Sequence, residues 1–362
     1  MSIISEWQKQ LDQNKGHSLE ANFLITTPMF IGDGRQKADS IRPPSIKGAL
    51  RFWWRALYWH QFMGQAQSNE SMALKALHAA EADLFGSITT DQGAVQSRFS
   101  LVITRLEKNQ QNTPWRPGKG SGVKYLMGQG VSSNDPEDFI TEGSSFDLIL
   151  SGKPGATGPT STQWVELEQT LLLWGLLGGL GSRARKGLGS VSLQSINGGV
   201  ASMPRNKDEY FAQLKGLLSP STSLTKLPPF TALSCHIHLG CCDEGSSPMK
   251  LIETVGLTMQ RYRSVDEGVN PGNRSVFGLP HKDFVATGQH PPRRASPLFS
   301  HIHQLPNGDC LAMQLLMPAQ FLPPETRVDE GVIDWKVIKR YLDSQFSREN
   351  TLFDAKESTS GN

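Results

Sequence analysis

Alternating apolar and polar positions predict β-strands in the first half of the chain. The predicted strands are residues 19–26, 97–104, 145–151 and a short run that begins at Val191. Apolar residues at helical spacing predict helices at 45–57, 71–85 and 163–177, the first of them with Ser45 as its N-cap. Apart from the helix at 71–85, the order is strand, helix, strand, strand, helix, strand. This is the βαββαβ order of a ferredoxin-like domain.

The second half of the chain repeats most of this order. The predicted elements are a strand at 231–239, a helix at 249–263, strands at 297–304 and 310–317, and a helix at 335–346. Asn307-Gly308 between the last two strands is the strongest short signal for a hairpin turn. The fourth strand is expected to be missing or irregular. We therefore expect an α+β protein of two ferredoxin-like (RRM-like) domains packed together, with loop insertions.

These elements set the expected domain boundaries. We expect an N-terminal segment at 1–17, a first domain at 18–196 with an insertion at 105–143, a linker at 197–228 that includes a helix at 208–218, a second domain at 229–347, and a flexible tail at 348–362. The insertion is rich in Gly, Ser, Asn, Gln and Pro and is far longer than an ordinary connection. We expect it to become ordered on a partner.

The overall composition is that of an ordinary globular protein. The 362 residues include 36 Lys and Arg and 34 Asp and Glu, which gives a net charge of +2 and excludes a uniformly basic surface. Four cysteines, two of them adjacent, form no disulfide framework and favour a reducing compartment. The start of the chain lacks the apolar core of a secretory signal, and no apolar run could span a bilayer. The expected location is the cytoplasm, with no membrane partner.

Positive charge is concentrated in one segment. Between Gly34 and His60 stand six basic residues against one acid, namely Arg35, Lys37, Arg42, Lys47, Arg51 and Arg55. Lys47, Arg51 and Arg55 share one face of the predicted helix, which is the footprint of a polyanion-binding patch. Trp54 and neighbouring aromatic residues could stack on unpaired bases. The alternative is that the tryptophans belong to the core and the charges form a solvated face.

A glycine-rich segment at 178–189 is the second candidate site. It formally fits a dinucleotide-binding fingerprint, but a helix precedes it and a strand follows it, which is the reverse of what that fold requires. Its backbone amides could instead approach phosphate oxygens, while its basic side chains supply charge. The candidate residues are Gly181, Ser182, Arg183, Arg185 and Lys186. The alternative is a turn packed against the sheet. Arg293 and Arg294, with Arg261 and Arg263, form a smaller basic set that could continue a track for a phosphate backbone.

Neither a metal site nor a cofactor is expected. The run Cys235-His236-Ile237-His238 with Cys241-Cys242 has residue types that suit zinc, but its spacing matches no usual pairing. No hydrolase motif occurs. His17 is the one histidine that we consider as a general base.

Several of these motifs together resemble a known family. The segments are Ile25–Gly32, Arg42–Leu57, Gly179–Gly189 and Arg293–Leu298. They resemble the RAMP superfamily and, within it, the first RAMP subunit of the type III-B (Cmr) CRISPR effector complex. The resemblance implies two ferredoxin-like domains and a non-catalytic ribonucleoprotein subunit of antiviral defence. Such a subunit would bind the 3′ region of the guide RNA and its paired target RNA beside other RAMP subunits.

Two other functions remain open at this stage. One is a metal-independent RAMP endoribonuclease that processes guide RNA, in which His17 acts as base and Lys47 or Arg185 stabilises the developing phosphate charge. The other is an assembly scaffold whose basic helix meets acidic neighbours rather than RNA.

Overall fold

Two antiparallel sheets organise the chain. The computed structural model describes residues 18–32, 37–88, 93–109, 118, 120–128, 139–153, 157–198, 202–264, 271–279, 293–320 and 334–354. The first sheet has four strands in the order β2-β3-β1-β4. Their bounds are β1 Ser18–Ile25, β2 Phe99–Glu107, β3 Ser145–Gly152 and β4 Val191–Asn197. The order and the antiparallel pairing are those of a ferredoxin-like domain.

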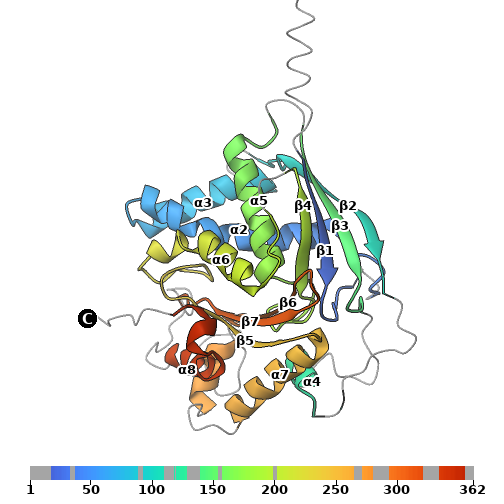
Figure 1. Cartoon of the computed structure of the whole chain (residues 1–362). Coiled ribbons are helices and arrows are strands. Elements are labelled where there is room, and N and C mark those ends of the chain that lie inside the picture. The colour runs from blue at the N-terminus through green and yellow to red at the C-terminus, as the bar shows by residue number, and fades with distance from the viewer. Residues whose placement is uncertain are drawn as a thin grey trace, which may run out of the picture.

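Helices cover one face of the first sheet (Figure 1). They are α2 Pro43–Gln65, α3 Glu70–Phe85, α5 Ser161–Leu177 and α6 Lys207–Leu218. Phe23 of β1 stacks on Phe146 of β3 at 5.1 Å between ring centroids and meets Trp174 of α5 at 4.7 Å. The alternating apolar residues of the strands therefore point toward the helices and build the core, as the period of two predicts.

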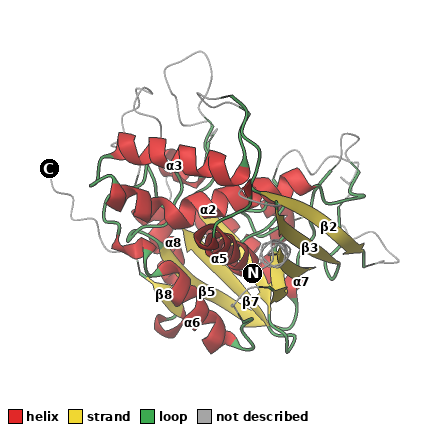
Figure 2. Ribbon diagram, turned by 90° about the horizontal axis from the view of Figure 1, so that it is seen from above, coloured by secondary structure: helices red, strands yellow, loops and turns green. Residues whose placement is uncertain are grey.

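The second sheet repeats this topology and is buried on both faces. It has four strands in the order β6-β7-β5-β8, with bounds β5 His238–Gly245, β6 Leu298–Gln304, β7 Cys310–Leu316 and β8 Thr351–Phe353. Helices α7 Pro248–Ser264 and α8 Lys336–Gln345 lie on its outer face, while the helices of the first domain lie on the other (Figures 1 and 2). Along β7, Leu311 and Met313 join the core of the first domain, whereas Ala312 and Leu316 join that of the second. The prediction of two ferredoxin-like domains is confirmed.

Hydroxyl side chains of the first domain tie it to β6. The Thr26 hydroxyl donates to the Ile302 carbonyl at 2.6 Å, and the Ile302 backbone N–H donates to the Ser190 hydroxyl at 3.1 Å. Two residues further along both segments, the Gln304 N–H donates to the Ser192 hydroxyl at 2.9 Å. Because these bonds are buried or partly buried, they fix the position of one domain against the other.

Three local predictions were wrong. Residues 231–237 form no strand, and β5 begins at His238. Helix α2 begins at Pro43 with Arg42 as its N-cap, because the fixed φ of proline suits the first helical turn, and Ser45 lies inside the helix. Residues 351–353 form strand β8 in the segment expected to be a flexible tail.

Strand β8 is the fourth strand of the second sheet, and its short, shifted pairing with β5 is irregular, as expected. Within the insertion, helix α4 Gly122–Met127 packs on α7.

Among the described residues, none of the helices combines the length and the apolar character needed to cross a bilayer.

Candidate nucleic-acid interface

The basic stripe on α2 is partly neutralised by a buried carboxylate from α3. Arg51 Nε and Arg55 Nη1 each lie 2.6 Å from Glu81 Oε1. Glu81 is 4% exposed, whereas the side chains of Arg51 and Arg55 are 35% and 32% exposed. The buried carboxylate thus binds the inner side of both guanidinium groups, and the exposed side of each remains accessible to an anion. No feature of the sequence pointed to Glu81, because it stands 26 residues from Arg55 on a different helix.

Lys47 begins this stripe. Its ammonium lies 5.5 Å from the centroid of the Phe99 ring, a cation–π distance. Partial burial lowers the pKa of Lys47, and the nearby charges of Arg51 and Lys153 lower it further. The like charges of Arg51 and Lys153 repel the Lys47 ammonium, so a bound anion would stabilise this end of α2.

The tryptophans of α2 belong to the core, which corrects the expectation that Trp54 stacks on a base. Trp54 is 1% exposed, and its Nε1 donates to Glu166 Oε2 at 2.9 Å. Burial raises the pKa of Glu166. Trp53 and Trp59 are also buried. Phe52 is the half-buried ring of this group, and it faces the neighbouring glycine-rich loop.

A pocket of about 380 Å³ opens between α2, α3 and the glycine-rich loop. It is lined by Phe52, Arg55, Leu74, Leu77, His78, Glu81, Arg185, Phe230 and Thr231. The Arg185 guanidinium lies 5.0 Å from the Phe52 ring centroid and 4.7 Å from that of Phe299, and it donates to the Ser296 carbonyl at 2.8 Å. Burial lowers the pKa of Arg185 to about 10, so it remains cationic at neutral pH. Cationic and aromatic groups therefore meet in one pocket.

The glycine-rich loop follows α5 and folds back on itself. Gly181 has a φ of +88°, and a Cβ there would stand 2.4 Å from the Phe30 carbonyl oxygen, so only glycine fits. The next residue, Ser182, donates its backbone N–H to that carbonyl at 2.7 Å. Gly181, Ser182 and Arg183 are exposed.

The loop separates basic residues that are close in sequence. Arg185 points to α2, whereas Arg183 donates from Nε to the Met127 carbonyl of α4 at 2.8 Å. Lys186 lies on the same side as Arg183: a Cβ on Gly128 would have Arg183 Nη2 and Lys186 Nζ as neighbours, each at 3.8 Å. The sequence grouped all three cations, and the structure divides them between two sites.

The remaining predicted site residues differ in their contacts and in their exposure. Arg294 donates to the Gln320 carbonyl at 2.6 Å and stacks on the Trp335 ring at 5.2 Å, and burial followed by the charge of Arg185 lowers its pKa to about 10. Arg293, Lys37 and Arg42 are exposed. Ser45 is half-buried in the first turn of α2, and Arg35 lies outside the described residues.

The cysteines and histidines of the run at 235–242 do not gather into one group of ligands among the described residues. His236 Nε2 contacts the Thr225 carbonyl at 2.7 Å, and the cysteines are free thiols. Among the described residues, one group of potential metal ligands gathers elsewhere, namely His238, Asp343 and Asp354. The Lys339 ammonium lies 3.0 Å from both carboxylates, so these acids already have a cation.

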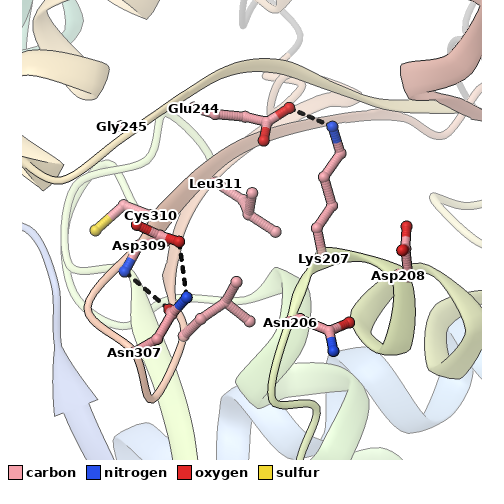
Figure 3. A pocket seen from close by; sticks show the side chains of 10 residues that line it. Asn206, Lys207, Asp208, Glu244, Gly245, Asn307, Asp309, Cys310 and Leu311 are labelled. Carbon is pink, nitrogen blue, oxygen red and sulfur yellow. Dashed lines mark hydrogen bonds and ion pairs between the residues drawn. The ribbon is translucent and has the colours of Figure 1, made fainter.

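A second pocket, of about 520 Å³, is polar and acidic (Figure 3). Asp208, Glu244 and Asp309 line it, together with Lys207. Lys207 pairs with Glu244, and Asn307 Nδ2 donates to Asp309 Oδ2 at 2.7 Å. Because its carboxylates would repel phosphate groups, this pocket does not extend the basic site.

Comparisons with known proteins agree with the fold and the motifs. The sequence model of the RAMP superfamily matches residues 22–192, which include α2 and the glycine-rich loop, so the resemblance to RAMP proteins is confirmed. The CRISPR system Cmr subunit Cmr1-1 of Pyrococcus furiosus is 24% identical over 339 residues, covering 88% of this chain and 91% of that protein.

Solved structures share the fold across nearly the whole chain. The crystal structure of Cmr1 from Pyrococcus furiosus in its apo form matches with a TM-score of 0.59 and 19% identity, covering 94% of this chain and 99% of that one. A chain of the cryo-EM structure of the type III-B Cmr-beta complex bound to cognate target RNA matches with a TM-score of 0.52 and 11% identity, covering 91% and 99%.

Proposed function

We propose that the chain is a non-catalytic, RNA-binding subunit of a type III-B CRISPR (Cmr) effector complex. It would bind the 3′ region of the guide RNA and its paired target RNA beside other RAMP subunits. Its similarity to Cmr1-1, and to a structure of Cmr-beta bound to target RNA, supports this proposal. The observation that carries it is the pocket between α2, α3 and the glycine-rich loop, where Arg55 and Arg185 meet the ring of Phe52.

This surface suits the sugar–phosphate backbone better than base edges. Lys47, Arg51 and Arg55 present cations in a row along α2, and Arg185 continues the row on the loop. Guanidinium groups bind phosphates through paired hydrogen bonds, and such contacts carry no sequence information. Binding is therefore expected to be largely sequence-independent and to weaken steeply with salt.

The test neutralises the stripe without adding acids. Glutamates opposite Glu81 would repel it, so Lys47, Arg51 and Arg55 are changed to glutamine together. The proposal expects a large loss of affinity for single-stranded RNA and a shallower dependence of log K on log salt, by about 0.7 for each phosphate that the variant no longer binds. Filter binding at several salt concentrations measures both.

A control variant removes three exposed cations elsewhere, namely Lys215, Lys250 and Arg348. Equal weakening by both triple variants would mean that net charge, and not this surface, governs binding. Unchanged affinity in the α2 variant would contradict the proposal. Specific scission of repeat RNA by the purified chain in chelator would contradict the non-catalytic role and favour an endoribonuclease.

A further inference from the structure

Three cations from different parts of the chain gather at the end of α4, on the opposite side of the glycine-rich loop from Arg185. They are Arg183 and Lys186 of the loop and Arg263 in the last turn of α7. We name this group the α4 socket. Burial and, after it, the neighbouring charges of Arg183 and Arg263 lower the pKa of Lys186 to about 8. The three groups are therefore close enough to repel one another.

The two arginines are held in place. Arg263 Nη1 donates to the Tyr125 hydroxyl of α4 at 2.9 Å, and its guanidinium lies 5.0 Å from the Phe277 ring centroid. Arg183 has a φ of +65°, a backbone conformation that side-chain-bearing residues rarely adopt, and it contacts the Met127 carbonyl. The Met127 carbonyl at the end of α4 explains the position of Arg183, because carbonyl groups at a helix C-terminus attract cations. It does not explain why Lys186 and Arg263 also lie there.

In the part of the chain that the structure describes, no carboxylate forms an ion pair with Arg183, Lys186 or Arg263. Partly buried charges of one sign cost free energy unless an opposite charge compensates them. An anion in the socket would supply that charge, and two guanidinium groups with one ammonium can donate hydrogen bonds to the non-bridging oxygens of a phosphate group.

We propose that the α4 socket binds one phosphodiester group of the RNA strand, and thereby joins the insertion, the glycine-rich loop and the second domain around it. This inference rests on the proposed RNA-binding function and adds a second contact point to it. A strand that crosses the loop from the α2 pocket would reach the socket on the other side. Since Arg263 belongs to the second domain, both domains would then hold the RNA.

The test uses the salt dependence of RNA binding by the full chain. Lys186→Gln, Arg263→Gln and the double variant are titrated with single-stranded RNA. If the cations share one phosphate, each single variant lowers the slope of log K against log salt by up to about 0.7, and the double variant by no more than that same amount. Unchanged slopes in all three variants would overturn the proposal. A loss of about 1.4 in the double variant would also overturn it, since that result means two separate phosphates.

A control separates the socket from general charge. Arg261→Gln removes an exposed cation from the same helical turn, so its slope should match that of the wild type. A changed slope in this control would contradict the assignment.

Stability of the chain without RNA tests for an internal counter-ion. The sequence holds Asp135, Glu137 and Asp138 outside the described residues. If the socket awaits an external anion, Lys186→Gln relieves repulsion and leaves the Tm at low salt unchanged or raised. A lowered Tm would assign the counter-charge to the chain itself and overturn the proposal. The Lys47, Arg51 and Arg55 variant reports on RNA binding independently, so failure of the socket and failure of the proposed function are distinguishable.

Discussion

A Cβ atom on Gly256 would stand 2.2 Å from the carbonyl oxygen of Gly122, so α7 and α4 meet through direct backbone contact. The Glu253 carboxylate strengthens this contact, because it accepts from the Gly122 N–H at 2.7 Å and from the Val123 N–H at 3.0 Å. The described helix of the insertion is therefore an integral part of the second domain and positions the residues of the α4 socket.

The glycine contact predicts the effect of a single methyl group. Gly256→Ala places a Cβ against backbone atoms that cannot move independently, so we expect a destabilisation of about 1 to 3 kcal/mol. Gly216→Ala in α6 is the matched control, since a Cβ there meets nothing within 4 Å and should stabilise the helix by about 1 kcal/mol. Urea unfolding of both variants checks the prediction. Equal effects of the two substitutions would show that the close contact does not matter.

Glu81 restrains two arginines of the proposed RNA surface. Glu81→Gln removes the shared negative charge from Arg51 and Arg55, so we expect tighter RNA binding with a steeper salt dependence. Stability should fall by about 1 to 2 kcal/mol, a value reduced because the arginines are partly solvated. Filter binding and urea unfolding measure the two effects.

The exposed pair of Arg205 and Glu209 provides the control for this variant. Glu209→Gln breaks an exposed arginine–glutamate ion pair at the start of α6, far in sequence from α2. It should leave RNA affinity unchanged. Weaker RNA binding by Glu81→Gln would mean that Glu81 orients the arginines for RNA instead of competing with it.

Periodicity predicted the fold because each sheet strand has a face that must be buried. Strands β1 and β3 were located within about one residue by alternation alone. The same rule failed in the second domain: residues 231–237 form no strand, and β5, which begins at His238, has four consecutive buried residues instead of an alternating pattern. The three-residue β8 is too short to carry a periodic signal.

The sequence predicted which basic residues belong to the candidate RNA site, but it did not predict how their side chains are arranged. The excess of cations on α2 was visible in the sequence, but Glu81, which binds two of them, comes from another helix. Arg183 and Arg185 stand two residues apart, and the loop directs them to opposite sides. Trp54 was expected to stack on a base, but it is buried and its Nε1 donates to Glu166, which is 112 residues away. Such tertiary pairings leave no local pattern.

Buried histidines in β6 predict sensitivity to acid. Burial lowers the pKa of His301 to about 3, although its Nδ1 donates to the Gly178 carbonyl at 2.7 Å. An unfolded histidine titrates near 6.5, so the unfolded chain binds the proton first, and stability is lost as pH falls below about 6.5. This histidine alone should cost about 2 kcal/mol between pH 7 and pH 5.

The measurement compares unfolding free energies at the two pH values. His301→Asn keeps a donor for the Gly178 carbonyl and cannot titrate, so the difference between pH 7 and pH 5 should shrink by about 2 kcal/mol. His78→Gln, at an exposed position, should leave that difference unchanged. An unaltered difference in His301→Asn would mean that the acid sensitivity arises elsewhere.

Lys186 predicts that RNA affinity falls in mild base. Burial and the charges of Arg183 and Arg263 lower the pKa of Lys186 to about 8, so the ammonium loses its proton as pH rises through that value. Because a phosphate binds the charged form, affinity should decrease about tenfold between pH 7 and pH 9. Lys186→Arg stays charged over this range and should flatten the profile, whereas Lys215→Arg on exposed α6 should follow the wild type. If the RNA affinity of the wild type does not change between pH 7 and pH 9, then Lys186 either stays protonated up to pH 9 in the free protein or does not bind the RNA.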